Sequence, residues 1–342
     1  MSSTSTILIV LIAALLHYHI GITKAQLDIG VNYGMDGNDL PSPATVVQLF
    51  KNYSIGKMRL LEPNNDVLEA LENGNIDVTI GIKNEDLPSI ASSPQAAGVW
   101  FNNHVEPFIP LMNFQYITAG NEVVPGDLAK HVLPAMQNIQ NVINSYNYTG
   151  LRVTTAVEIA ALEGFDPPSK GAFAQNARAD MVGIINFLSN TSSPLLVNVY
   201  PYFKFASDPD HVRLDYAQFT ATSPIVRDGN LNYYNMLDAI VDAFYWAMEK
   251  EGVSSVDAVV SESGWPSAGD GLWATPQLAQ TYNQNFLKKF IARQATPKRP
   301  DHYLEGFIYG MFNENKKPAG VDQHWGLFNS DGTPVYPVFT KV

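Results

Sequence analysis

The chain has 342 residues, of which 46% are hydrophobic and 16% charged, and it contains no cysteine. Its 17 Phe, 16 Tyr and 5 Trp supply enough apolar surface for a packed core, which excludes a disordered chain. The lack of cysteine excludes disulfides, thiolate metal sites and a cysteine nucleophile, and the net charge of −12 makes nucleic acid or an anionic membrane a poor partner.

Residues 1–25 predict a cleaved signal peptide. The ten consecutive apolar residues from Ile7 to Leu16 are too few to span a bilayer but suit the core of a secretory signal. Thr23 and Ala25 supply the small residues that a cleavage site requires, so we expect the mature protein to begin at Gln26 and to be secreted to the extracellular space. Residues 26–342 contain no segment long and apolar enough to predict a membrane helix.

Three N-glycosylation sequons fit an exported protein. They begin at Asn52, Asn147 and Asn190, each in a polar stretch between apolar segments. Because such stretches leave room for a glycan, the sequence predicts a secreted glycoprotein.

From residue 26 onward, short apolar runs alternate with longer segments of helical character. The helical segments include 43–52, 128–145 and 234–251, and the last of these has an apolar face. No linker or low-complexity tract divides the chain, so residues 26–342 are expected to form one catalytic domain. Eight alternations predict a single (β/α)8 TIM barrel of the α/β class, with a doubly wound open sheet as the alternative. The runs are Leu27–Tyr33, Lys57–Leu61, Asp77–Ile82, Tyr116–Ala119, Leu151–Val157, Leu195–Tyr200, Val256–Val260 and Leu304–Phe312.

Three acidic residues stand out near the ends of predicted strands. Glu122 follows the fourth, Glu262 the seventh and Glu314 the eighth. Active sites of such barrels lie at the carboxyl ends of the strands, and the fourth and seventh strands lie across the barrel from each other, so Glu122 and Glu262 are expected to face one another over a cleft. Two opposed carboxyl groups suit glycoside hydrolysis, in which one protonates the leaving oxygen and the other attacks the anomeric carbon or activates water.

Aromatic residues gather at the same predicted strand ends. Tyr33 follows the first strand, Tyr200 and Phe203 the sixth, and Trp265 the seventh. Their rings are expected to offer apolar faces to the C–H surfaces of sugar units, which together with the paired carboxyl groups indicates a carbohydrate substrate.

The segments around these residues resemble plant endo-1,3-β-glucanases of glycoside hydrolase family 17. The resemblance is carried by G-N-E-V at 120–123, N-V-Y-P-Y-F at 198–203 and S-E-S-G-W-P-S at 261–267, and it extends through 29–31, 133–140 and 326–328. It implies a (β/α)8 barrel, no metal or organic cofactor, and an open cleft that cleaves 1,3-β-glucan internally. We expect a monomer in the plant apoplast that acts on callose or fungal wall glucan, the latter in plant defence.

The resemblance also assigns roles. It implies a retaining mechanism with Glu122 as acid/base and Glu262 as nucleophile, which requires the two carboxyl groups to lie about 5 to 5.5 Å apart. Glu122 must then stay protonated near the working pH through burial or a neighbouring negative charge, while Glu262 stays ionised. Asn121 is placed to donate to the sugar 2-hydroxyl or to Glu262. Glu314 and Lys317 are similar to family site residues, and either tune this field as an ion pair or brace the barrel rim.

The sequence departs from the family pattern at two strand ends. Leu61 and Glu62 stand where the family commonly has Tyr and Asp, and Asn313 and Lys316 stand where it usually has Asp and Gln. These changes put rate, pH optimum or substrate preference in question, and two kinds of alternative follow. One is a mixed-linkage 1,3;1,4-β-glucanase or a transglycosylase, and the other is a catalytically silent or weakly active glucan-binding protein with the same groove.

Overall fold

The computed structural model describes residues 26–341 and confirms the predicted barrel. Within this part of the chain, eight parallel strands close into a ring in the order β1-β12-β11-β8-β5-β4-β3-β2. The alternative of an open sheet is wrong, because β1 pairs with both β2 and β12. The barrel strands are β1 (Leu27–Asn32), β2 (Ile55–Leu60), β3 (Asp77–Ile82), β4 (Phe114–Asn121), β5 (Arg152–Glu158), β8 (Leu195–Asn198), β11 (Ala258–Ser263) and β12 (Glu305–Tyr309).

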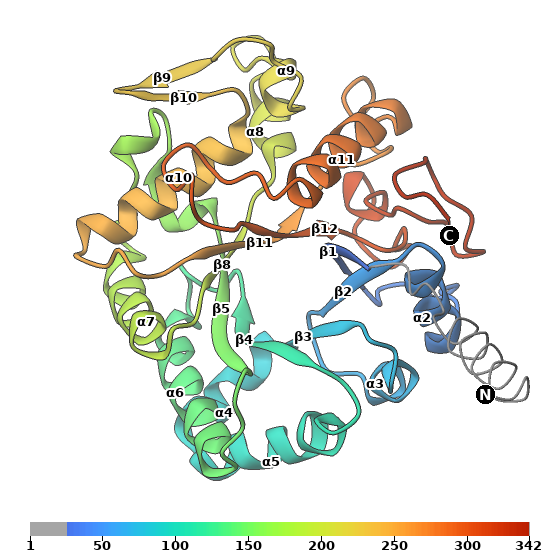
Figure 1. Ribbon diagram of the computed structural model, residues 1–342, viewed down its shortest axis with the longest axis vertical. Coiled ribbons are helices and arrows are strands. Elements are labelled where there is room, and N and C mark those ends of the chain that lie inside the picture. The colour runs from blue at the N-terminus through green and yellow to red at the C-terminus, as the bar shows by residue number, and fades with distance from the viewer. Residues whose placement is uncertain (1–25, 342) are drawn as a thin grey trace, which may run out of the picture.

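Helices cover the outside of this ring (Figure 1). The three predicted helical segments are confirmed to within two residues at each end. The helices are α2 (Pro43–Asn52), α3 (Asn65–Leu71), α4 (Leu87–Ser92), α5 (Pro94–His104), α6 (Ala129–Ser145), α7 (Arg178–Thr191), α8 (Pro201–Ser207), α9 (Leu214–Ala217), α10 (Met236–Lys250) and α11 (Pro276–Ile291).

Local sequence signals determine where several of these helices begin. The side chain of Ser42 accepts a hydrogen bond from the backbone N–H of Thr45 at the start of α2, and Thr275 caps α11 in the same way. Each of these caps is followed by a proline at the first helical position, where the missing N–H has no cost. The first residues of α2 and α11 are therefore determined by local sequence.

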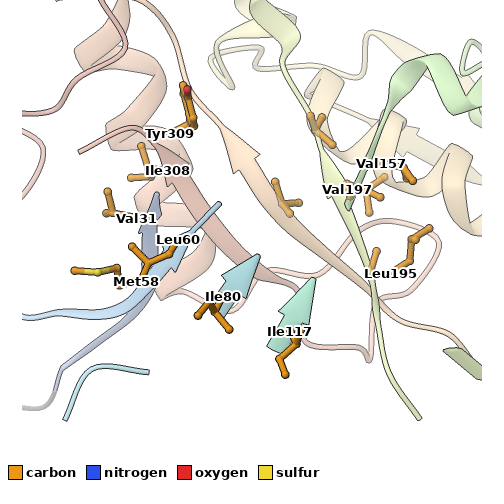
Figure 2. Packing of buried hydrophobic residues seen from close by; sticks show 14 of the residues in the cluster. Val31, Met58, Leu60, Ile80, Ile117, Val157, Leu195, Val197, Ile308 and Tyr309 are labelled. Carbon is orange, nitrogen blue, oxygen red and sulfur yellow. The ribbon is translucent and has the colours of Figure 1, made fainter. Parts of the chain in front are cut away.

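The barrel strands bury both of their faces. Met58, Leu60 and Ile117 belong to the large apolar core between strands and helices, part of which Figure 2 shows. Because side chains alternate along a strand, Lys57 and Arg59 on β2 face the interior of the barrel. A smaller apolar cluster fills the middle of that interior and consists of Tyr116, Ala156, Leu196, Val259 and Phe307.

Charged groups close the amino-terminal end of the barrel. Lys57 Nζ lies 2.6 Å from Asp28 Oδ1 and 3.1 Å from Glu305 Oε1, and the hydroxyl of Tyr116 donates to Glu305 Oε2 at 3.1 Å. Burial of such groups is tolerated only when they are paired. The opposite, carboxyl-terminal end is left as the open mouth of the barrel.

Two small hairpins extend from the barrel. The first, β6 (Leu162–Gly164) with β7 (Ala172–Phe173), follows β5, and the second, β9 (Val226–Asp228) with β10 (Leu231–Tyr233), precedes α10. Figure 1 shows β9 and β10 beside α8 and α9. These insertions belong to the connections after β5 and β8, so they extend the wall of the mouth on that side.

Three predictions concern export: the signal peptide, the lack of a membrane helix and the glycosylation sequons. The predicted signal peptide lies outside the described residues. None of the helices within residues 26–341 has the length and apolar character needed to cross a bilayer. Asn147 and Asn190 of the sequons are exposed, whereas Asn52 is half-buried at the end of α2.

Candidate active site

Glu122 comes directly after β4 in an unusual backbone conformation. Its φ angle is +56°, and that of Gly120 is +79°. A positive φ is uncommon for a residue with a side chain and is retained where the surrounding structure enforces it, often at functional sites. The backbone N–H of Glu122 donates to the carbonyl of Ala156 on β5 at 2.9 Å, which holds this turn against the neighbouring strand.

Glu262 lies within β11 itself, because this strand extends to Ser263 instead of ending near the predicted Val260. The pairing of β11 with β8 changes register between Val260 and Glu262, so that Glu262 lies opposite Asn198. Such irregularities, of which β-bulges are the best-known kind, redirect side chains and are common next to active sites. The side chain of Glu262 is 6% exposed and reaches the mouth of the barrel.

Two donors hold the Glu262 carboxylate. Arg59 Nη1 donates to Oε1 at 2.5 Å, and the hydroxyl of Tyr200 donates to Oε2 at 2.7 Å. Burial and the charge of Glu262 raise the pKa of Tyr200 well above its usual value, so its hydroxyl keeps the proton that it donates. Charge-assisted hydrogen bonds of this kind are strong and fix the orientation of the carboxylate.

The Arg59 guanidinium links Glu262 to Asn121, the residue before Glu122. It is fully buried, and Nη2 donates to Asn121 Oδ1 at 2.8 Å while Nη1 also donates to Asn32 Oδ1 at 2.9 Å. Asn198 Nδ2 donates to the same Asn121 oxygen at 3.1 Å. Both hydrogen bonds involve Oδ1, and among residues 26–341 the Nδ2 group donates to no side chain or backbone acceptor, so it remains available as a donor toward a ligand.

Glu122 lies in a different electrostatic environment. Its side chain opens onto the solvent of the cleft, yet the surrounding protein displaces part of its hydration shell. This desolvation, followed by the negative charge of Glu262, raises the pKa of Glu122 to about 7. Asn198 Nδ2 donates to Glu122 Oε1 at 2.7 Å and opposes the rise. Glu122 therefore holds a proton at a pH where an ordinary glutamate has lost it.

Both carboxyl groups line one cleft of about 640 Å³. A second cavity of about 620 Å³ shares Ile159 and Lys204 with it, so the groove continues toward the β6–β7 hairpin. The first cleft is lined by Glu122, Glu158, Ile159, Asn198, Tyr200, Phe203, Lys204, Glu262, Tyr309, Lys317, Pro318, Asp322 and Trp325.

Comparison with known proteins agrees with this geometry. Residues 29–339 match the model of glycosyl hydrolases family 17. The chain belongs to this family. It is therefore a glycoside hydrolase, and the two glutamates lie in the cleft that such an enzyme requires.

Similar proteins share both sequence and fold with this family 17 member. It is 48% identical over 321 residues, 93% of each chain, to the Arabidopsis thaliana protein named "Probable glucan endo-1,3-beta-glucosidase BG4". It is 43% identical to Lichenase-2 of Hordeum vulgare, over 91% of this chain and 97% of that protein. The solved structure of CJP38, described as a β-1,3-glucanase and allergen of Cryptomeria japonica pollen, matches with a TM-score of 0.87 and 45% identity, covering 91% of this chain and 98% of that one.

The structure brings some of the predicted binding residues to the cleft. Tyr200, Phe203 and Lys317 line it together with the two glutamates. Phe203 is 47% exposed, and its ring meets Tyr200 edge-on with 5.6 Å between centroids. An exposed aromatic ring on the wall of a cleft fits the expected contact with sugar C–H faces.

Two aromatic predictions are corrected by the structure. Trp265 is fully buried, packs against Tyr202 and donates its indole N–H to the carbonyl of Trp273 at 2.7 Å, so it supports the cleft wall from behind. Tyr33 is 4% exposed and does not line the cleft, because its ring packs against Phe312. Aromatic side chains from other parts of the chain cover both rings, with Phe312 against Tyr33 and residues of α8 and α11 against Trp265.

Glu314 and Lys317 lie close to one another but have closer partners. Lys317 Nζ is 3.9 Å from Glu314 Oε2 and 2.9 Å from the hydroxyl of Tyr309. Glu314 is buried and accepts a hydrogen bond from the backbone N–H of Asp36 at 2.8 Å. Glu314 thus fastens the loop after β1, while Lys317 faces the cleft.

Sequence reasoning missed several residues that build the site, namely Arg59, Glu158, Asn198, Tyr309 and Trp325. The sequence did contain a signal for Arg59. It is a charged residue between apolar neighbours in a strand that is buried on both faces, so its side chain has to point into the barrel and be paired there. Glu158 directly follows the predicted strand Leu151–Val157, and Asn198 begins the N-V-Y-P-Y-F segment, so both also had a local signal. Tyr309 and Trp325 have none, because their place in the cleft depends on packing between distant segments.

The departures from the family pattern lie outside the lining of this cleft. Glu62 Oε2 pairs with Lys83 Nζ at 2.8 Å on the barrel rim, beside the half-buried Leu61. Asn313 Oδ1 accepts a hydrogen bond from the backbone N–H of Gly326 at 2.9 Å, an interaction that an aspartate would also provide. Lys316 is exposed. Within residues 26–341, none of these four residues forms a hydrogen bond or ion pair with Glu122 or Glu262.

Proposed function

We propose that this protein is a secreted, monomeric endo-1,3-β-glucanase that cleaves internal linkages of 1,3-β-glucan by a retaining double displacement. The observation that carries the proposal is the contrast between two carboxyl groups in one cleft. Glu122 has a pKa raised to about 7, whereas Glu262 forms an ion pair with Arg59 and accepts a second hydrogen bond from Tyr200. A proton donor and a nucleophile are the two groups that this chemistry needs.

In the first step a carboxylate oxygen of Glu262 attacks the anomeric carbon. The bond from that carbon to the glycosidic oxygen breaks, and the oxygen leaves with the proton of Glu122. In the second step Glu122, now ionised, takes a proton from water, whose oxygen attacks the same carbon and releases Glu262. Arg59 and Asn198 hold the amide of Asn121 through its Oδ1, and its Nδ2 group is placed to donate to the sugar 2-hydroxyl.

The shape of the site supports cleavage within a chain. The cleft and the adjoining cavity form a groove open to solvent, and a groove accepts a polysaccharide without requiring a chain end. Similar proteins named as glucan endo-1,3-β-glucosidases support the linkage. Callose and fungal wall glucan are the proposed substrates, and the predicted signal peptide together with exposed sequons at Asn147 and Asn190 supports export.

The decisive experiment compares the wild type with Glu122→Gln and Glu262→Ala on laminarin. We expect the wild type to release reducing ends with retained β configuration, as followed by NMR of the first product, and both variants to lose activity by a factor of about 10⁴ or more. Circular dichroism verifies that the variants remain folded. Release of the α anomer, or full activity of Glu262→Ala, would overturn the proposed mechanism.

A second candidate activity follows from the identity with Lichenase-2. Lichenan, a mixed-linkage 1,3;1,4-β-glucan, is therefore assayed beside laminarin, and faster release from lichenan would replace the proposed substrate. Transfer products on laminari-oligosaccharides would indicate a transglycosylase. Binding to laminarin without release of any product would establish a silent glucan-binding protein.

A further inference from the structure

A third carboxylate in the catalytic cleft has no role in the chemistry described so far. Glu158 ends β5, is half-buried and lines the cleft with Glu122 and Glu262. Among residues 26–341, no group donates a hydrogen bond to its side chain or forms an ion pair with it. Buried polar groups nearly always have hydrogen-bond partners, and this half-buried carboxylate has none in the part of the chain that the structure describes, so it is available for a ligand.

The order of the strands shows which part of the substrate passes Glu158. Glu262 on β11 is expected to contact the anomeric carbon, and the path around the barrel from it to Glu122 on β4 runs through β8 and β5. This direction follows the bond from the anomeric carbon to the leaving group, since Glu122 gives its proton to the leaving oxygen. The leaving sugar therefore lies on the β5 side.

The lining of the groove supports this direction. On the other side of Glu262 the cleft is bounded by Tyr309 and Lys317, which belong to β12 and the loop after it. On the β5 side it continues past Ile159 and Lys204 into the second cavity, with space for further units of the released chain.

We propose that Glu158 accepts hydrogen bonds from the hydroxyl groups of the glucosyl unit that leaves, and thereby determines the preference for sugar leaving groups and sugar acceptors. The inference rests on the proposed function. An ionised carboxylate accepts from two neighbouring hydroxyls at once, and Glu158 is a carboxylate without a partner on the correct side of the cleavage point. The same group binds an incoming sugar acceptor during transfer, because that acceptor occupies the place of the leaving sugar.

Glu158 also acts on Glu122 through its charge. Its negative charge helps to raise the pKa of Glu122, although less than desolvation and Glu262 do. Glu158→Gln removes the charge and keeps a hydrogen-bond acceptor, whereas Glu158→Ala removes both. A contribution through charge alone would therefore be the same in the two variants.

The test compares two substrates that differ in the leaving group. Laminaripentaose releases a sugar, whereas 4-nitrophenyl β-laminaribioside releases a phenol without sugar hydroxyls. We expect Glu158→Ala to lower kcat/KM for the pentaose about tenfold or more. Its kcat/KM for the aryl substrate should change less than about twofold. The kcat/KM of Glu158→Gln for the pentaose should lie between those of the wild type and Glu158→Ala. Transfer to added laminaribiose should fall with the pentaose activity.

Glu62→Ala is the matched control, because it removes a carboxylate from another strand end outside the cleft. Equal losses on both substrates, or no loss on either, would overturn the role of Glu158. Equal behaviour of Glu158→Gln and Glu158→Ala would likewise overturn it in favour of charge alone. Wild-type release from laminarin and its absence in Glu262→Ala test the proposed function separately, so the two failures are distinguishable.

Discussion

The hydrogen bond from Asn198 to Glu122 offers a direct test of how the site controls the proposed acid. Asn198 Nδ2 lies 2.7 Å from Glu122 Oε1 and is a donor that favours the ionised carboxylate. Replacing Asn198 by alanine removes this donor and leaves the two causes that raise the pKa, namely desolvation and the charge of Glu262. The pKa of Glu122 should therefore rise above about 7.

The size of the rise follows from the strength of the lost interaction. A hydrogen bond to a charged group is worth about 1.5 to 3 kcal/mol. Because the side chain of Glu122 opens onto solvent, water screens and partly replaces the donor, and we take the lower end of this range. About 1.4 kcal/mol corresponds to a rise of about one pH unit.

The assay is the dependence of kcat/KM on pH with laminarin as substrate, from about pH 4 to about pH 9. The alkaline limb of this profile reports the acid of the free enzyme, so its midpoint should move from near 7 in the wild type toward 8 in Asn198→Ala. The maximal rate should also fall, because Asn198 donates a hydrogen bond to Asn121. The midpoint of the alkaline limb reports the pKa of Glu122 independently of that fall.

Asn84→Ala is the control for this experiment. Asn84 holds the backbone of Asn121 through two hydrogen bonds, at 2.9 and 3.0 Å, without touching the carboxyl group of Glu122. Its alkaline limb should stay at the wild-type position. An Asn198→Ala limb that stays unmoved or shifts to lower pH would refute the account of the electrostatics at Glu122.

Three further predictions concern the surroundings of the site. A Cβ atom at Gly34 would overlap the carboxylate of Glu314, so Gly34→Ala should lower the melting temperature and kcat together. Burial raises the pKa of Asp242 to about 6 from 3.8, so between these pH values the folded state keeps a proton that the unfolded chain loses. The free energy of unfolding should therefore fall by about 3 kcal/mol as the pH rises from about 3.8 to about 6. In Asp242→Asn, the free energy of unfolding measured with urea should depend less on pH over this range. Asn313→Asp should retain the hydrogen bond from Gly326 and change kcat/KM on laminarin less than about twofold.

Each of these has an outcome that would contradict it. Wild-type melting and rate in Gly34→Ala would mean that Glu314 moves without consequence. A pH dependence of unfolding that persists in Asp242→Asn would assign it to other groups. A large gain or loss in Asn313→Asp would show that the neutral side chain at this position does tune the enzyme.

The sequence by itself determined the barrel and the position of the two glutamates along it. Apolar runs of strand length alternate with amphipathic helices, and such alternation is a local property that survives without knowledge of any contact. Because parallel strands present their carboxyl ends at one face, the places where these runs end also indicated that Glu122 and Glu262 would share a cleft. The structure confirms the barrel and the shared cleft.

Only the tertiary structure decided which neighbours surround these glutamates. The change of register in β11 places Glu262 opposite Asn198, and Arg59 reaches both Glu262 and Asn121 across the barrel interior. The same packing buries Trp265, which the sequence places at the mouth, and leaves Glu158 facing the groove. Strand register and the burial of a side chain by distant segments arise from contacts between residues far apart in the chain, and no local pattern encodes them.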